Sequence, residues 1–243
     1  MSALPLAGRR VVVLRAAEGP DRMRDALCAE GADATTVAVA DVVDRSDAEL
    51  RSGVGDLAGY RWVVVTSRHG ARRLQSWADA WPPATRIGAV GPSTAECVAQ
   101  VGLPVDAVAP EGTARSLADA LDGGPVLFLA AATARDDLAR ELASRGVELT
   151  TVVAYDVVRR ELADDDRAQV VASDAIVAMA PVAIDALDAL PDTPRAVAMR
   201  IPLVAIGPTT AARAAALDWP VAQVAATREP PSVCAAVRAL RAR

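Results

Sequence analysis

Hydroxyl, glycine and proline residues gather at short turns that follow apolar stretches of the chain. Two of these turns are alike, Gly91-Pro-Ser-Thr-Ala95 and Gly207-Pro-Thr-Thr-Ala211, and a third contains Thr66, Ser67 and Arg68. Glycine permits a tight turn, proline suits the first position of a helix, and the hydroxyls can cap its free amides. The same geometry can hold an anion, because the amides and the helix dipole point at the turn. A structural cap and an anion site both remain open for each turn.

Tyr155 and several arginines add side chains that could act on an acidic ligand. Tyr155 ends an apolar stretch, where its hydroxyl either donates a proton or only completes the packing. Five arginines lie near the ends of such stretches or in first helical turns, where an arginine can hold a carboxylate through two parallel hydrogen bonds: Arg15, Arg68, Arg72, Arg73 and Arg135. His69 is expected to be a solvated residue of a first helical turn, since the sequence shows no catalytic partner for it.

The residue types that are missing exclude most covalent and metal-assisted catalysis. All 26 basic residues among the 243 are arginine, and without lysine the chain cannot form a Schiff base or a Walker phosphate-binding loop. One histidine and three scattered cysteines do not give a zinc site of the usual spacing. We therefore expect no cofactor and no metal.

Net charge and the hydropathy pattern bear on partners and location. A net charge of −5 argues against a general nucleic-acid binder, which normally carries a basic stripe. No stretch approaches the roughly 18 apolar residues that span a membrane. The N-terminal segment places a basic pair after a short apolar stretch, which is the reverse of a secretory signal. We expect a cytoplasmic monomer that binds a small molecule, with no nucleic acid and no membrane as partner.

Short β-rich stretches alternate with helical ones along the whole chain. The predicted strands are continuously apolar, as parallel strands buried on both faces are; they cover 10–14, 62–66, 87–90, 126–129, 149–155, 175–178 and 203–206. Predicted helices follow nearly every strand, at 21–30, 68–80, 92–101, 114–121, 134–145, 181–189, 208–217 and 231–241. A further helix is expected to begin at the acidic run Asp164-Asp-Asp166, which the helix dipole favours. The alternation predicts an α/β protein with doubly wound parallel sheets.

The chain also repeats itself at a distance of about 115 residues. The segment that begins at Val13 aligns with the one that begins at Phe128, and the turn at Gly91 aligns with the turn at Gly207. A period this long does not fit a solenoid. It indicates two domains that are copies of one α/β unit, with a ligand cleft between them.

The ordered set of these motifs resembles the uroporphyrinogen-III synthase family over essentially the whole chain. The resemblance rests on Val63–Ser67, the two Gly-Pro turns, Arg135-Asp-Asp-Leu138, Tyr155 and the closing segment 230–237. It implies two α/β domains joined by a two-stranded connector. One domain would contain 1–37 with 157–243 and the other 42–150, with connector strands near 36–42 and 150–157.

The resemblance also implies an activity that needs no cofactor. The family converts hydroxymethylbilane, a linear tetrapyrrole with eight carboxylates, into the macrocycle uroporphyrinogen III; water is lost and the last pyrrole ring is inverted. Tyr155 matches the family tyrosine that is the best candidate to help the hydroxyl depart. The implied substrate-binding residues are Arg15, Thr66, Ser67, Arg68, Gly91, Ser93, Thr94, Arg135, Gly207, Thr209 and Thr210.

Two short segments depart from the family pattern. Ala130-Ala131 stand where the family often has Arg-Gly, and Met179-Ala180 replace a second Thr-Ser pair. These losses leave two alternatives open beside the enzyme. One is a degenerate homologue that senses a tetrapyrrole, and the other is a two-domain binding module for a small anion.

Overall fold

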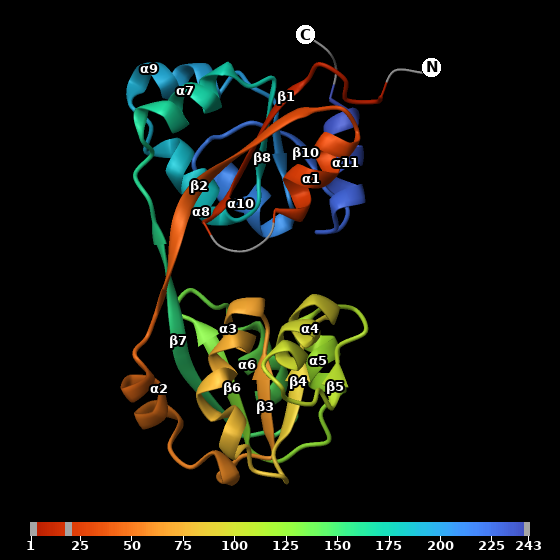
Figure 1. Cartoon of the computed structure of the whole chain (residues 1–243), viewed down its shortest axis with the longest axis vertical. Helices are drawn as coiled ribbons and strands as arrows, with labels where there is room; N and C mark the ends of the chain where they lie inside the picture. The colour runs from red at the N-terminus through yellow and green to blue at the C-terminus, as the bar shows by residue number, and fades with distance from the viewer. Residues whose placement is uncertain (1–3, 18–20, 241–243) are drawn as a thin grey trace. The chain divides into compact units, whose positions relative to one another are not determined.

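The computed structural model describes residues 4–17 and 21–240, and their contacts divide the chain into two compact units. Unit 1 contains the described residues up to Val42 and from Val158 onward, and unit 2 contains Val43–Val157. Each unit has a parallel sheet with helices packed on it (Figure 1). The predicted α/β fold class with parallel sheets is therefore confirmed.

The sheet of unit 1 has the strand order β10-β9-β8-β1-β2. Its strands are β1 (Arg10–Ala16), β2 (Asp33–Asp44), β8 (Ala175–Ala178), β9 (Leu203–Ala205) and β10 (Val221–Val224). Its helices are α1 (Arg22–Ala29), α7 (Asp164–Ala172), α8 (Pro181–Asp188), α9 (Asp192–Ala198), α10 (Pro208–Ala216) and α11 (Pro230–Arg238). Helix α7 begins at the acidic run, as the helix dipole predicts.

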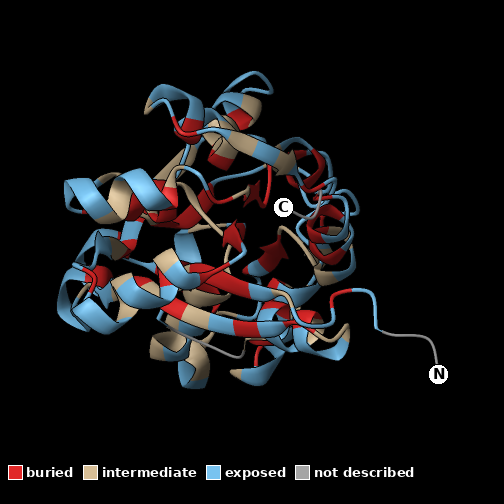
Figure 2. Cartoon of the chain, turned by 90° about the horizontal axis from the view of Figure 1, so that it is seen from above, coloured by how far each residue is buried: buried red, intermediate tan, exposed pale blue. Residues whose placement is uncertain are grey.

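Both faces of this sheet are covered, which explains why its strands are continuously apolar. On β1, Val12 and Leu14 belong to the apolar cluster that includes residues of α7, α8, α9 and α10. Val11 and Val13 point the other way, into a second cluster with residues of α1 and α11. Figure 2 shows buried strands between helices whose outer surfaces are exposed. Each fully buried aliphatic side chain contributes about 1.5–3 kcal/mol of transfer free energy.

The sheet of unit 2 has the strand order β7-β6-β3-β4-β5. Its strands are β3 (Trp62–Val65), β4 (Arg86–Ala89), β5 (Ala107–Val108), β6 (Val126–Ala131) and β7 (Leu149–Arg159). Its α-helices are α2 (Asp47–Val54), α3 (Arg68–Arg73), α4 (Pro92–Gln100), α5 (Ala114–Asp119) and α6 (Asp137–Ala143). One apolar cluster packs Trp62, Val64 and Phe128 of the strands against Leu117 of α5 and Leu138 of α6.

The two units share one strand order when β1 is matched with β6, β2 with β7 and β8 with β3. They also share one irregularity. The pairing register shifts between Arg15 and Ala16 where β1 meets β2, and between Ala130 and Ala131 where β6 meets β7. These positions are about 115 residues apart, as the sequence repeat requires. Tyr155 lies immediately after the second shift, and an irregularity of this kind re-aims the side chains next to it.

Some predicted elements end earlier than expected or were missed. The stretch 68–80 is an α-helix only to Arg73; Leu74–Ala80 is a 3-10 helix, which tightens the chain before Trp81 and the following prolines. Helix α6 begins at Asp137, three residues later than predicted, because Asp136 is its N-cap. The apolar pattern of the sequence does not mark helices α2 and α9 or strands β5 and β10, although α2 is as long as α1 and β10 is as long as β3.

Candidate functional site

The turn after β3 presents a serine at the start of α3. Ser67 is the N-cap of this helix, and its Oγ accepts a hydrogen bond from the Gly70 backbone N at 2.9 Å. Thr66 and Arg68, on either side of it, are half-buried. The expected N-cap role of Ser67 is therefore confirmed, and the turn places three polar side chains at the carboxyl end of the central strand of unit 2.

Tyr155 reaches the same serine from β7. Its hydroxyl donates a hydrogen bond to Ser67 Oγ at 2.8 Å, and only 7% of the tyrosine is exposed. Burial raises the pKa of Tyr155 above its ordinary value, and the hydrogen bond to Ser67 partly opposes that rise. The phenol therefore keeps its proton at neutral pH and presents it to Ser67.

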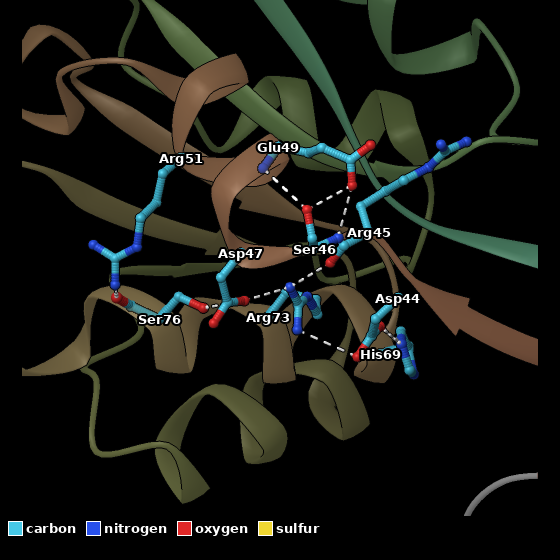
Figure 3. A network of polar contacts seen from close by, with 9 residues as sticks. All are labelled: Asp44, Arg45, Ser46, Asp47, Glu49, Arg51, His69, Arg73 and Ser76. Atoms are coloured by element: carbon cyan, nitrogen blue, oxygen red, sulfur yellow. Dashed lines mark hydrogen bonds and ion pairs between the residues drawn. The ribbon is translucent and has the colours of Figure 1, made fainter.

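His69 lies against the tyrosine ring and is not the solvated residue that the sequence predicts. Its side chain is 15% exposed, and the His69 and Tyr155 ring centroids are 4.5 Å apart, with the planes tilted by 59°. His69 Nε2 lies 2.5 Å from Asp44 Oδ1 (Figure 3). Sequence reasoning missed Asp44, because it lies at the end of β2 and no local spacing links it to His69.

A network of polar contacts joins the end of β2 and the start of α2 to α3 (Figure 3). Arg73 Nη1 donates to Asp44 Oδ2 at 3.2 Å, and Arg73 Nη2 donates to Asp47 Oδ1 at 2.7 Å and to the Arg45 carbonyl at 2.9 Å. Ser46 and Glu49 form a capping box at the start of α2. Arg73 is thus engaged by the protein itself, and the network fixes the position of Asp44.

The two Gly-Pro turns have the same backbone geometry. Gly91 precedes α4 and Gly207 precedes α10, each as the N-cap, and both have extended backbones with φ of −176° and 178°. An added Cβ at either glycine would meet no atom within 4 Å. Neither turn therefore needs glycine for its own conformation or packing, and each leaves space in which a ligand atom can approach the backbone.

The hydroxyls of these turns do not cap their helices as expected, because each lies inside the first helical turn and the N-cap is glycine. Thr94 and Thr210 are buried, whereas Ser93 is exposed and Thr209 is half-buried. Ser93 and Thr209 therefore occupy corresponding positions with side chains that solvent can reach.

The arginines that the sequence singled out lie in different surroundings. Arg15, at the end of β1, is 14% exposed and forms an ion pair of 3.7 Å with Asp21, which is itself 10% exposed. Arg135 precedes α6, is 63% exposed and pairs with Asp137 at 3.3 Å. A largely buried guanidinium that is paired with a carboxylate has a better defined position than one that extends into solvent.

Both departures from the family pattern fall at the ends of strands. Ala130 is 2% exposed and belongs to the apolar cluster of unit 2. Ala180 is the N-cap of α8 and has no hydroxyl that could accept from the helix amides. The corresponding positions of the other unit are occupied by Arg15 and Ser67.

The predicted site residues thus divide between the units. Unit 2 brings Thr66, Ser67, Arg68 and Tyr155 together at one strand end, with Gly91, Ser93 and Thr94 following its neighbouring strand and Arg135 near the end of β6. Unit 1 contains Arg15, Gly207, Thr209 and Thr210.

Metal-binding clusters and membrane spans are both absent from residues 4–17 and 21–240. Within these ranges, no group of three or more histidine, cysteine or acidic residues could hold a metal ion. None of the helices in that part of the chain is both long and apolar enough to cross a membrane.

Comparison with known proteins shows the family to which the chain belongs. Two solved structures share the fold. One is a uroporphyrinogen-III synthetase from Helicobacter pylori, with a TM-score of 0.66 and 15% identity over 96% of this chain and 100% of that chain. The other is a mutant uroporphyrinogen III synthase from Thermus thermophilus, with a TM-score of 0.60 and 21% identity over 94% of this chain and 97% of that chain. A search of curated proteins gave no significant match. The family model described as uroporphyrinogen-III synthase HemD matches residues 6–235, and the chain therefore belongs to that family.

Proposed function

We propose that this protein converts hydroxymethylbilane into uroporphyrinogen III in tetrapyrrole biosynthesis, and that the hydroxyl pair of Tyr155 and Ser67 supplies the proton for the first step. Membership of the family supports the reaction. The observation that carries the site is the 2.8 Å hydrogen bond from the Tyr155 hydroxyl to Ser67 Oγ. It joins two groups that can move a proton, one on β7 and one in the turn after β3 of the same sheet.

The direction of the hydrogen bonds supports Ser67 as the residue that donates the proton to the substrate. Ser67 Oγ accepts from both Tyr155 and the Gly70 amide, so its own hydrogen is left to donate elsewhere. Accepting two hydrogen bonds polarises a hydroxyl and makes it a better donor. Ser67 thus faces the leaving hydroxyl of the substrate, and Tyr155 replaces the proton that Ser67 gives up.

The proton balance of the reaction closes without an external acid. The carbon–oxygen bond of the hydroxymethyl group breaks as the pyrrole nitrogen donates electrons, and the oxygen leaves as water with the proton from the hydroxyl pair. The resulting cation is attacked by a carbon of the last ring, and the ring inverts through a spiro intermediate. Loss of a proton from a pyrrole carbon restores aromaticity and returns one proton, so the net product is the macrocycle and water.

Carboxylate binding is assigned to backbone amides and arginine. The turns at Gly91 and Gly207 precede the amino ends of nine-residue helices, where a carboxylate is stabilised by the helix dipole. Arg15 adds a fixed positive charge in unit 1. Arg68 lies beside Ser67, where it can hold a carboxylate near the proton donor.

The proposal includes independence of cofactors, a monomeric state and a cytoplasmic location. The pyrrole nitrogens drive the ionisation, so the protein needs to supply only orientation and a proton. A chain without lysine and with a single histidine offers few groups for other catalytic strategies.

The test is the product of purified protein incubated with hydroxymethylbilane. After oxidation, chromatography separates isomer III from isomer I, which is formed when the substrate closes without enzyme. Isomer III as the main product, unchanged by a chelator, supports the proposal. Tight binding of hydroxymethylbilane with isomer I alone overturns it and favours the tetrapyrrole sensor; absence of both binding and isomer III favours the module for another small anion.

A further inference from the structure

Tyr155 is contacted by a residue other than its hydrogen-bond partner Ser67. His69 is the only histidine of the chain, and its ring lies 4.5 Å from the ring of Tyr155. Because Ser67 and His69 are two residues apart in the first turn of α3, one helix end contacts both the hydroxyl and the ring of the tyrosine. Rotation of the tyrosine side chain away from Ser67 is therefore opposed by His69.

Asp44 fixes the histidine in turn. An ionised carboxylate only accepts hydrogen bonds, so the 2.5 Å contact with Asp44 Oδ1 places a hydrogen on His69 Nε2. The other oxygen of Asp44 accepts from Arg73 Nη1 at 3.2 Å. Both partners come from α3, and the carboxylate is thereby held from two sides (Figure 3).

The next residue, Arg45, contacts both chain neighbours of Tyr155. Its backbone N donates to the Ala154 carbonyl at 3.0 Å. Its guanidinium Nε lies 2.8 Å from Asp156 Oδ2 in an ion pair whose members are 43% and 29% exposed. Asp44 and Arg45 therefore constrain Tyr155 through its ring and through both of its chain neighbours, and all these residues lie within unit 2.

We propose that Asp44, Arg45 and His69 are positioning residues for Tyr155, which keep its hydroxyl directed at Ser67 while the substrate reacts. This inference rests on the proposed function. A proton donor must stay within hydrogen-bond reach of its acceptor, and a displacement of about 1 Å can lower a rate by about 10²-fold. The three residues act through Tyr155 and need not touch the substrate.

The first test separates turnover from binding. We expect His69→Ala to lower kcat about 10-fold to 10²-fold and Asp44→Asn to lower it by a smaller factor, with KM changed less than about twofold in both. Because Asp44 acts through His69, the double variant should be no slower than His69→Ala alone. Glu49→Gln is the matched control: it removes a charge from the same cluster without contacting His69 or Asp44, and kcat should stay unchanged.

The second test reads the tyrosine directly and does not require activity. In a Tyr60→Phe background Tyr155 is the only tyrosine, so its ionisation can be followed by ultraviolet absorbance. Because burial is the main cause of its raised pKa, His69→Ala should admit water and lower that pKa, whereas Glu49→Gln should not. Imidazole nitrogen NMR signals, which come from one residue only, should show hydrogen on Nε2 and should change in Asp44→Asn.

The outcomes decide the two proposals separately. If His69→Ala and Asp44→Asn match Glu49→Gln in kcat and in the Tyr155 titration, the positioning role is wrong. It is equally wrong if the variants raise KM and leave kcat unchanged, since that pattern belongs to substrate contact. If the wild type makes no isomer III, the proposed function fails, and the titration and the NMR signals still decide whether these residues position Tyr155.

Discussion

In unit 2, Thr66 and Ser67 follow β3, the strand next to β6, whereas in unit 1 Met179 and Ala180 follow β8, the corresponding strand next to β1. Ser67 caps its helix and accepts from Tyr155, while Ala180 occupies the same N-cap position with a similar extended backbone and has no polar side chain. The two strand ends share a backbone conformation, but only unit 2 has hydroxyl groups there.

At the ends of β1 and β6 the polar residue is in unit 1 and the apolar residue is in unit 2. Unit 1 has Arg15 paired with Asp21 at the end of β1, and unit 2 has the buried Ala130 at the matching place on β6. Tyr155 on β7 corresponds to Ala40 on β2. One unit thus retains a charge that can bind a carboxylate, and the other retains hydroxyls that can move a proton. The two copies therefore keep different polar side chains at these matching strand ends.

The largest effect is expected at Tyr155, where the difference between the units is greatest. Tyr155→Phe keeps the ring packing against His69 and removes only the hydroxyl that resupplies Ser67 with its proton. General-acid assistance typically contributes about 10²–10⁴-fold, and the lability of the substrate places the expected loss of kcat near the lower limit. KM should change little. Tyr60→Phe is the control, and a Tyr155→Phe enzyme with full kcat would make Tyr155 a structural residue.

Arg15→Gln tests the binding role of unit 1. Loss of one charge-assisted contact costs about 1.5–3 kcal/mol, which corresponds to an increase in KM of at least about 10-fold. The kcat value should remain within a factor of two or so, because the contact is made equally in the ground state and the transition state. Arg10→Gln changes an exposed arginine at the other end of the same strand and should have no kinetic effect. A fall in kcat at constant KM would place Arg15 in the chemistry instead.

Placing the threonine and serine of unit 2 at positions 179 and 180 tests whether unit 1 can use a polar pair after β8. Ala180→Ser should raise the free energy of unfolding by about 1 kcal/mol, because a serine N-cap can accept from an amide of α8, and Ser67→Ala should lower it by a similar amount. Urea unfolding measures both. Adding Met179→Thr to Ala180→Ser should also lower KM by a few-fold. Unchanged stability and KM would show that unit 1 does not use this strand end.

The smallest expected effect is on the pH dependence of stability. The pKa of Tyr155 is raised above 10.0 in the folded state, so the folded form holds the phenol proton more tightly than the unfolded form. The contribution of this group to stability is complete below about pH 10 and is lost as the pH rises through the folded-state pKa. The stability difference between wild type and Tyr155→Phe should therefore be constant at lower pH and move against the wild type at alkaline pH. A difference that stays constant through the alkaline range would show that Tyr155 is not protected from ionisation.

Much of this fold could be predicted because its signals are local. Apolar strands such as Trp62–Val65 and capping residues such as Ser67 are recognised from a few neighbouring positions. The repeat predicted which strands correspond, and the matching register shifts agree with it. The role of Asp44 could not be predicted, since it depends on a contact with His69 that only the folded chain creates.

The most direct test of the roles proposed for Arg15 and Tyr155 is the ratio of isomer III to isomer I formed at saturating hydroxymethylbilane by wild type, Arg15→Gln and Tyr155→Phe. Saturation compensates for weaker binding but cannot replace a missing proton donor. We predict that wild type and Arg15→Gln make almost only isomer III, whereas Tyr155→Phe releases a substantial share of isomer I because spontaneous closure competes with the slowed reaction. Almost pure isomer III from Tyr155→Phe, or isomer I from saturated Arg15→Gln, would contradict the proposed roles of these two residues.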